Sequence, residues 1–122
     1  MLASRLVRVS RARRRCKGTA EARLALDVYH HRLRHYVGAY LALLGGADAI
    51  VFTAGVGENS PTTRAAAVAG MEWLGISLDE GLNSARSGDA RIVSSGDSRI
   101  AVLVVPTNEE LEIARQAVAV VR

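Results

Sequence analysis

The sequence predicts an α/β protein, and three observations favour this fold class. A short apolar run with Ile, Val and Phe at residues 49–53 is typical of a β-strand. A second strand-like segment at residues 99–105 follows an intervening helical pattern. Helical periodicity extends along residues 21–44 and again along residues 107–121. The order helix, strand, helix, strand pair, helix indicates one sheet with helices packed on it.

Composition limits what kind of protein this is. The 122 residues are 49% hydrophobic but only 4% aromatic, so aliphatic side chains must fill a single core. Apolar runs stay well short of the roughly 20 residues that span a bilayer, and no secretory leader is recognisable. We therefore expect a soluble, cytoplasmic protein without a membrane partner. Cys16 is the only cysteine, which excludes an internal disulfide framework and a multi-cysteine zinc site.

The positive charge is concentrated at the N-terminus. Residues 1–17 hold seven of the 16 basic residues and no acid, so the remainder has a net charge of −3 although the whole chain has +4. We expect residues 1–19 to be a basic, disordered segment and residues 20–122 to be the folded part. A basic segment of this kind could also bind nucleic acid through its phosphates, and this alternative stays open although we consider it the weaker one.

Residues 21–44 have the pattern of a long amphipathic helix. Gly45 and Gly46 follow it and are typical of a C-cap. The apolar positions at helical spacing are Tyr29, Leu33, Tyr36, Val37, Tyr40 and Leu44. His31 and His35 are four residues apart on one face, a spacing that two metal ligands can use, but no acid or cysteine stands near them at a suitable spacing. We therefore favour a polar helix face over a metal site.

The strand at residues 49–53 is continuously apolar, which predicts burial on both faces of a sheet. A glycine turn follows, and Ser60 with Pro61 supplies an N-cap and a favoured first helical residue. The pattern predicts one helix from Pro61 to about Leu74, ending at Gly75. Its inward residues are Val68, Met71 and Leu74.

The last third of the chain predicts a loop, two strands and a helix. Turn residues dominate residues 77–89, and residues 91–93 and 99–105 are strand-like. Thr107 with Glu110 three residues later is a capping-box pattern for a final helix. The residues of this helix that we expect to face inward are Leu111, Ala114, Val118 and Val121.

The glycine turn between the first strand and the following helix is the candidate binding site. Gly55 and Gly57 would let the backbone approach a ligand, and amides at a helix start carry partial positive charge. The segment is neither a G-x-G-x-x-G fingerprint nor a P-loop, since it lacks GK[ST]. These residues alone are therefore compatible with an anion site of another type or with a plain turn.

Three longer stretches resemble a known family. VFTAGVGENSPTTRAAAVAGMEWLGISLD, followed by VLVVPTNEELEIARQAV, resembles the C-terminal part of acetate kinase, and RLALDVYHHRLRHYVGAYLALLGGADAI resembles the helix before it. The segments GVGEN and PTNEE, in this order and at this separation, are specific to it. The resemblance implies an incomplete RNase H-like domain of the actin-like ATPase type, with a central sheet flanked by helices.

The resemblance also implies a reaction and a site. Acetate kinase transfers the γ-phosphoryl group of ATP to acetate, giving ADP and acetyl phosphate, with Mg²⁺ as the metal, and it is a dimer. By this resemblance Glu109 would help to hold Mg²⁺, and no catalytic residue is assigned. The nucleotide-binding segment would comprise Gly55, Val56, Gly57, Glu58 and Asn59.

The chain also departs from the family. It corresponds to less than the second of the two domains of an acetate kinase, and MLASRLVRVSRARRRCKGTA does not resemble the expected segment. We therefore expect a partial C-terminal domain that binds nucleotide weakly, forms a homodimer and has no activity alone, with a separate chain as one possible source of the missing domain. The alternative is a non-catalytic fragment that self-associates or contacts nucleic acid. Acetate and longer carboxylic acids both remain open as substrates.

Overall fold

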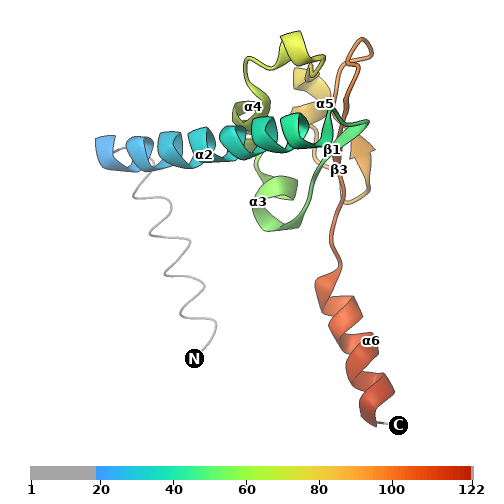
Figure 1. Cartoon of the computed structure of the whole chain (residues 1–122). Helices are drawn as coiled ribbons and strands as arrows, with labels where there is room; N and C mark the ends of the chain where they lie inside the picture. The colour runs from blue at the N-terminus through green and yellow to red at the C-terminus, as the bar shows by residue number, and fades with distance from the viewer. Residues whose placement is uncertain (1–18, 122) are drawn as a thin grey trace.

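The computed structural model describes residues 19–121 (Figure 1). The segment predicted to be disordered, residues 1–19, lies outside the described residues except for Thr19, and so does its nucleic-acid alternative. The described part is an α/β structure with a small mixed sheet and helices around it, as predicted. No helix among residues 19–121 is long and apolar enough to cross a membrane.

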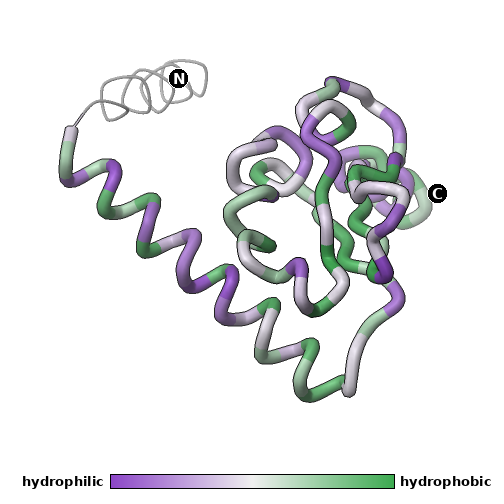
Figure 2. The backbone as a smooth tube through the Cα atoms, turned by 90° about the horizontal axis from the view of Figure 1, so that it is seen from above, coloured by the Kyte–Doolittle hydropathy of each residue, from purple (hydrophilic) through white to green (hydrophobic). Residues whose placement is uncertain are grey.

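The first described element is the long helix α2, Ala20–Leu44. Thr19 caps its start, since the Thr19 side chain accepts a hydrogen bond from the Ala22 amide. Gly45 ends it in the left-handed conformation with φ of 71°, which confirms the predicted C-cap. The N-terminal end of α2 extends beyond the body of the protein, and the remainder lies against it (Figures 1 and 2). The first hydrogen bond along the helix to another element is that of His30 Nε2 with Thr63 Oγ1 at 3.2 Å.

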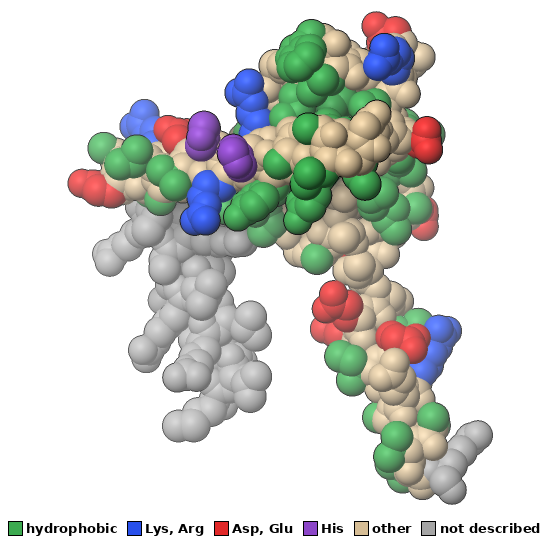
Figure 3. Space-filling view, viewed as in Figure 1, with side chains coloured by type: hydrophobic (Ala, Val, Ile, Leu, Met, Phe, Trp, Pro, Cys, Tyr) green, Lys and Arg blue, Asp and Glu red, His purple; other side chains and the backbone are tan. Residues whose placement is uncertain are grey.

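Only one stripe of α2 reaches the core. Leu41 is buried, and Leu33 and Val37 pack against the core cluster. Tyr36 and Tyr40 are 50% and 61% exposed, so the tyrosines of the predicted apolar face remain largely in solvent. Apolar side chains therefore gather along the outside of this helix, next to its histidines (Figure 3).

The sheet has three strands in the order β1-β3-β2: β1, Ala49–Phe52; β2, Arg91–Ile92; and β3, Ala101–Val104. β1 is parallel to β3, and β2 is antiparallel to β3. The expectation that residues 49–53 are buried on both faces is wrong. In β1 only Phe52 is buried. β1 is an edge strand of the described sheet, and its other residues are exposed or half-buried.

The segment between β1 and β2 contains four short helices: α3, Ala54–Asn59; α4, Pro61–Val68; the 3₁₀ helix η1, Glu72–Leu74; and α5, Glu80–Ser84. The predicted single helix from Pro61 to about Leu74 is thus divided, because Gly70 adopts a φ of 71° that a helix cannot continue through. The predicted loop at residues 77–89 contains α5, which Asp79 caps by accepting from the Leu82 amide.

The core lies between α2, α4 and the sheet. α4 packs on α2 and presents Ala67 and Val68 inward, and Met71 follows on the same side. Val102 and Val104 of β3 are completely buried. Apart from Phe52, the buried core side chains are not aromatic, as the low aromatic content predicts.

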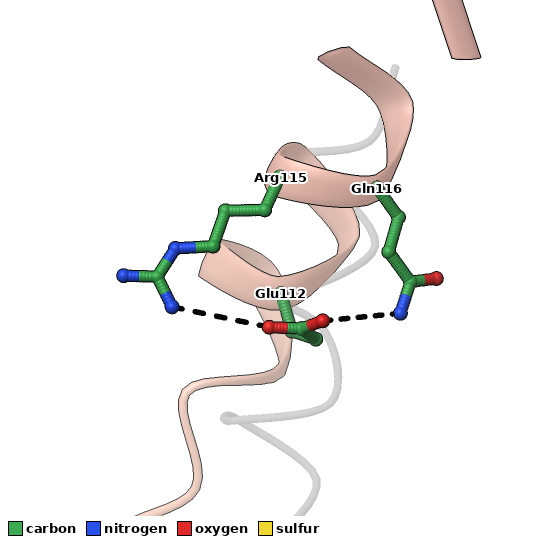
Figure 4. A network of polar contacts seen from close by, with 3 residues as sticks. All are labelled: Glu112, Arg115 and Gln116. Atoms are coloured by element: carbon green, nitrogen blue, oxygen red, sulfur yellow. Dashed lines mark hydrogen bonds and ion pairs between the residues drawn. The ribbon is translucent and has the colours of Figure 1, made fainter. Parts of the chain in front are cut away.

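The last helix, α6, Glu109–Val121, projects away from the body (Figures 1 and 3). The prediction that its apolar residues face inward is wrong, because no residue of α6 is buried. Its polar contacts are internal: Glu112 pairs with Arg115 at 3.9 Å and accepts from Gln116 Nε2 at 3.1 Å (Figure 4). Such pairs stabilise a helix by only a few tenths of a kcal/mol each, roughly 0.3–0.5.

Candidate functional site

The GVGEN segment follows β1 directly, but it is not a turn. Residues Ala54–Asn59 form α3, so the expected glycine turn is replaced by one and a half turns of helix. The chain enters α3 through Ala54, which has a φ of 59° in the left-handed region that disfavours a side chain. The abrupt change of direction between strand and helix is therefore made by a strained alanine rather than by a glycine.

The two glycines of α3 have different surroundings. A Cβ added at Gly57 would lie 3.2 Å from the backbone carbon of Phe52, so Gly57 is needed for close packing of α3 on β1. A Cβ added at Gly55 would meet nothing within 4 Å, and Gly55 is exposed. Only Gly55 is therefore open to a ligand from outside.

The side chain of Glu58 joins the two family segments. Its Oε1 accepts hydrogen bonds from the Thr107 amide at 2.8 Å and from Thr107 Oγ1 at 3.1 Å. Thr107 therefore does not form the predicted capping box with Glu110, because the Thr107 amide, which Glu110 would accept from in that motif, donates to Glu58 instead. GVGEN and PTNEE, 49 residues apart in sequence at these two positions, are in direct contact.

The hydrogen bonds of Glu58 keep its carboxylate ionised. They lower the pKa of Glu58: the Thr107 amide has the largest effect, the Thr107 hydroxyl and the Ala54 backbone add to it, and desolvation opposes it. At neutral pH Glu58 is therefore an acceptor for Thr107.

The other predicted site residues lie on the surface. Asn59 Nδ2 donates to the Gly55 carbonyl at 2.9 Å, which closes the last turn of α3, and Val56 is exposed. Glu109 is exposed in the first turn of α6 and forms no hydrogen bond or ion pair with other described residues.

The sequence did not reveal the residue that supports α3. Arg64 of α4 is 0% exposed, and its Nη1 donates to the carbonyls of Gly57 at 2.7 Å and Glu58 at 2.9 Å. Its Nε and Nη2 donate to the side-chain and backbone oxygens of Asn83 in α5, at 2.7 and 2.6 Å. One guanidinium thus satisfies carbonyls at the end of α3 and connects α3, α4 and α5.

Arg64 is buried as a cation without a carboxylate partner among the described residues. Burial lowers the pKa of Arg64, and the charge of Arg91 lowers it further, but an arginine remains protonated. A signal for this residue is present in the sequence. Arg64 shares a helix face with Ala67, Val68 and Met71 at helical spacing, so a cation stands in an apolar stripe.

The histidines of α2 do not form a metal centre in the described part of the chain. His31 and His35 are exposed and line an open depression together with Arg34 and Met71. No group of three or more His, Cys, Asp or Glu residues within the described residues could hold a metal ion. The polar-face interpretation of this pair therefore remains the preferred one.

The mixed sheet flanked by helices defines an α/β protein, and its solved neighbours have the actin-like ATPase fold. The model of the acetokinase family matches residues 2–115, most of the chain. The chain therefore belongs to the acetokinase family, which confirms the resemblance seen in its sequence. The match includes most of the N-terminal segment, and a domain boundary after residue 19 stays a prediction.

Relatives of known sequence and structure agree with this assignment. Acetate kinase of Leifsonia xyli is 66% identical over 104 residues, covering 85% of this chain and 26% of that protein. The crystal structure of Porphyromonas gingivalis acetate kinase superposes with a TM-score of 0.73 at 42% identity, over 86% of this chain and 26% of that one. A propionate kinase of Francisella tularensis gives 0.68 at 33% identity, over 84% and 26%. The chain thus spans about a quarter of the length of these relatives.

Replacing Arg64 should destabilise the fold strongly. Arg64→Met keeps a long side chain but leaves four buried or partly buried oxygens without their donor, so we expect a loss of about 3 kcal/mol in the free energy of unfolding. Urea unfolding followed by circular dichroism measures it. The exposed Arg86 provides the control, since Arg86→Met should change stability by less than about 0.5 kcal/mol. Equal stability of the two variants would contradict this role of Arg64.

The contact between Glu58 and Thr107 should depend on pH in a defined direction. Because the folded-state pKa of Glu58 is lowered, the contact is complete above the ordinary glutamate pKa and is lost as pH falls through the lowered value. The Thr107 amide shift in ¹⁵N-labelled protein should therefore titrate in acid below the ordinary glutamate range. In Glu58→Gln this transition should vanish, and a persistent transition would assign it to another group.

Proposed function

We propose that this chain forms the part of an acetokinase that holds the phosphates of ATP or ADP and contributes to holding Mg²⁺. The kinase to which it corresponds transfers the γ-phosphoryl group of ATP to acetate or another short carboxylate. The observation that carries the proposal is the contact of Glu58 with Thr107, which brings the proposed nucleotide segment next to the segment of the proposed metal ligand. Family membership supplies the reaction class.

The residues present fit a nucleotide phosphate and a magnesium ion. At Gly55 the space that a Cβ would occupy is empty, so a phosphate could approach the backbone there. Glu109 offers a free carboxylate, and carboxylate oxygens are ligands that Mg²⁺ prefers. When bound, the metal would neutralise charge on the phosphates during transfer. Of the proposed segment, Gly55, Val56 and Asn59 are exposed to a ligand, whereas Gly57 and Glu58 have structural contacts.

We propose that the matched quarter of the relatives lacks some of the groups that the reaction needs. Phosphoryl transfer requires positive groups on both sides of the moving phosphoryl group. The only buried cation of the described part, Arg64, is bound to protein oxygens. We propose that the opposing side comes from residues outside the matched quarter, in the same or another polypeptide, and that the 122 residues alone have no turnover. A cytoplasmic location follows from the same proposal.

Nucleotide binding should depend on Gly55 and be weak. Because the proposed site is open to solvent, which screens charged contacts, we expect ADP with Mg²⁺ to bind on the order of millimolar, or about −4 kcal/mol. Gly55→Val should abolish binding by blocking the backbone without disturbing the fold, since nothing lies near its Cβ. An NMR titration with ADP measures both effects.

The second glycine provides the contrast. Gly57→Val should destabilise the protein itself, because its Cβ would press on the Phe52 backbone. Shifts at residues 55–59 and 109 upon addition of ADP, absent in Gly55→Val, would support the proposal. ADP affinity that is unchanged in folded Gly55→Val would contradict it, and acetate-dependent ATP consumption lost on Glu109→Ala would contradict the absence of turnover.

We also propose that the chain forms a homodimer through α2. The family resemblance implies dimers, and Tyr36 and Tyr40 form part of an exposed apolar surface on α2. Tyr36→Glu or Tyr40→Glu should therefore dissociate the dimer at micromolar concentration without unfolding it, as light scattering and circular dichroism would show. Val37→Glu is the matched control and should unfold the protein, because Val37 packs against the core. A monomer in the unaltered chain would refute the dimer.

A further inference from the structure

Few hydrogen bonds connect the last segment, residues 106–121, to the rest of the described protein. β3 ends at Val104, and the Val105 amide still donates to the Phe52 carbonyl at 2.9 Å. Beyond that point, within residues 19–121, the two hydrogen bonds from Thr107 to Glu58 are the only ones that connect residues 106–121 with the remainder. One carboxylate thus holds a segment that otherwise extends into solvent (Figure 1).

We propose that Glu58 is a positioning residue: its carboxylate holds Thr107 and thereby sets where the Glu109 carboxylate stands relative to the nucleotide segment. This inference rests on the proposed function, because it assigns a role toward the Mg²⁺–nucleotide complex. It differs from the expectation of the sequence, in which Glu58 itself belongs to the nucleotide contacts.

The geometry makes Glu58 an effective anchor. The Thr107 amide and hydroxyl both donate to the same Oε1, so the contact restrains the backbone and the side chain of Thr107 together. Glu109 follows two residues later, and with about 3.8 Å between successive Cα atoms its Cα lies within about 7.6 Å of that of Thr107. A fixed Thr107 therefore confines Glu109 to a small region beside α3.

The backbone of Glu58 is itself fixed by buried residues of the protein body. The Glu58 carbonyl accepts from Arg64 Nη1 at 2.9 Å, and Arg64 is bound to Asn83 through two further hydrogen bonds. Arg64 and Asn83 are both buried. The carboxylate of Glu58 therefore projects from a rigid support, which is what a positioning residue requires.

The carboxylate has no other described partner among side chains. Glu58 Oε1 is engaged by Thr107, and neither oxygen forms an ion pair with a described residue. A direct contact of Glu58 with nucleotide phosphate would bring two anions together, which is unfavourable. The observed use of the carboxylate as an acceptor for Thr107 agrees with a role toward the metal ligand.

The test compares ADP affinity with and without MgCl₂ in the full 122-residue chain, by NMR titration. Glu58→Ala and Glu109→Ala should each lose most of the Mg²⁺-dependent gain in ADP affinity. In Glu58→Ala the Mg²⁺-free ADP affinity should change by less than about twofold. Glu58→Gln should retain the gain, since its amide oxygen can still accept from Thr107. The double variant Glu58→Ala/Glu109→Ala should lose no more than Glu109→Ala, because Glu58 acts through Glu109.

Two further measurements keep the result interpretable. Hydrogen exchange of the Thr107 amide should be slow in the unaltered chain and in Glu58→Gln, and fast in Glu58→Ala, which tests the contact without nucleotide. Glu110→Ala is the matched control, since Glu110 is an exposed acid next to Glu109 without a hydrogen bond to a described residue. It should alter neither measurement.

The outcomes separate this inference from the proposed function. An unaltered chain without any Mg²⁺-dependent gain would overturn the proposed function and the inference with it. If the Mg²⁺-dependent gain in ADP affinity persists in Glu58→Ala, the positioning role of Glu58 is overturned but the proposed function is not. Loss of Mg²⁺-free ADP binding in Glu58→Ala, with the fold intact, would assign Glu58 a direct nucleotide contact and would also overturn it.

Discussion

The structure around the candidate site depends on one buried guanidinium. Arg64 replaces the solvent that would otherwise satisfy carbonyls at the end of α3, and it does so with neutral oxygens only. Burying a charge is costly unless it is fully hydrogen-bonded, and Arg64 meets this condition with four bonds to α3 and α5. Arg64 of α4 thus fixes the position of α3 after β1 through the carbonyls of Gly57 and Glu58, whereas α3 is open to solvent at Gly55.

A chain of hydrogen bonds leads from the buried Arg64 to the exposed Thr107. Asn83 donates to the Pro61 carbonyl and accepts from Arg64, Arg64 holds the backbone of Glu58, and Glu58 holds Thr107. Buried groups therefore support an exposed carboxylate, and the exposed carboxylate supports the segment that carries the proposed metal ligand. The rigid part and the ligand-facing part of the site are consequently different residues: Arg64 and Glu58 support, while Gly55 and Glu109 face solvent.

Sequence patterns correctly predicted those structural features that depend on residues close to one another in the chain. The caps at Gly45 and Ser60 and the strand pair before α6 are local features, and all are present. The helical state of GVGEN was missed because two glycines within six residues disfavour a helix, and tertiary packing on Phe52 overrides that propensity. Arg64 was missed because the carbonyls that it binds belong to other elements.

The wrong prediction for α6 shows where such patterns stop being informative. An amphipathic helix indicates that one face favours an apolar neighbour, but its spacing does not say which segment provides that neighbour. Residues such as Leu111 and Val118 have the spacing of a core face and yet are 42% and 55% exposed, and the only hydrogen bonds that join residues 106–121 to the rest of residues 19–121 go to Glu58. The exposed apolar side chains of α2 and α6 are therefore surfaces for which residues 19–121 supply no covering neighbour. The polar contact of Thr107 with Glu58 fixes where the last segment leaves the body, and no buried apolar residue of α6 fixes its direction within residues 19–121.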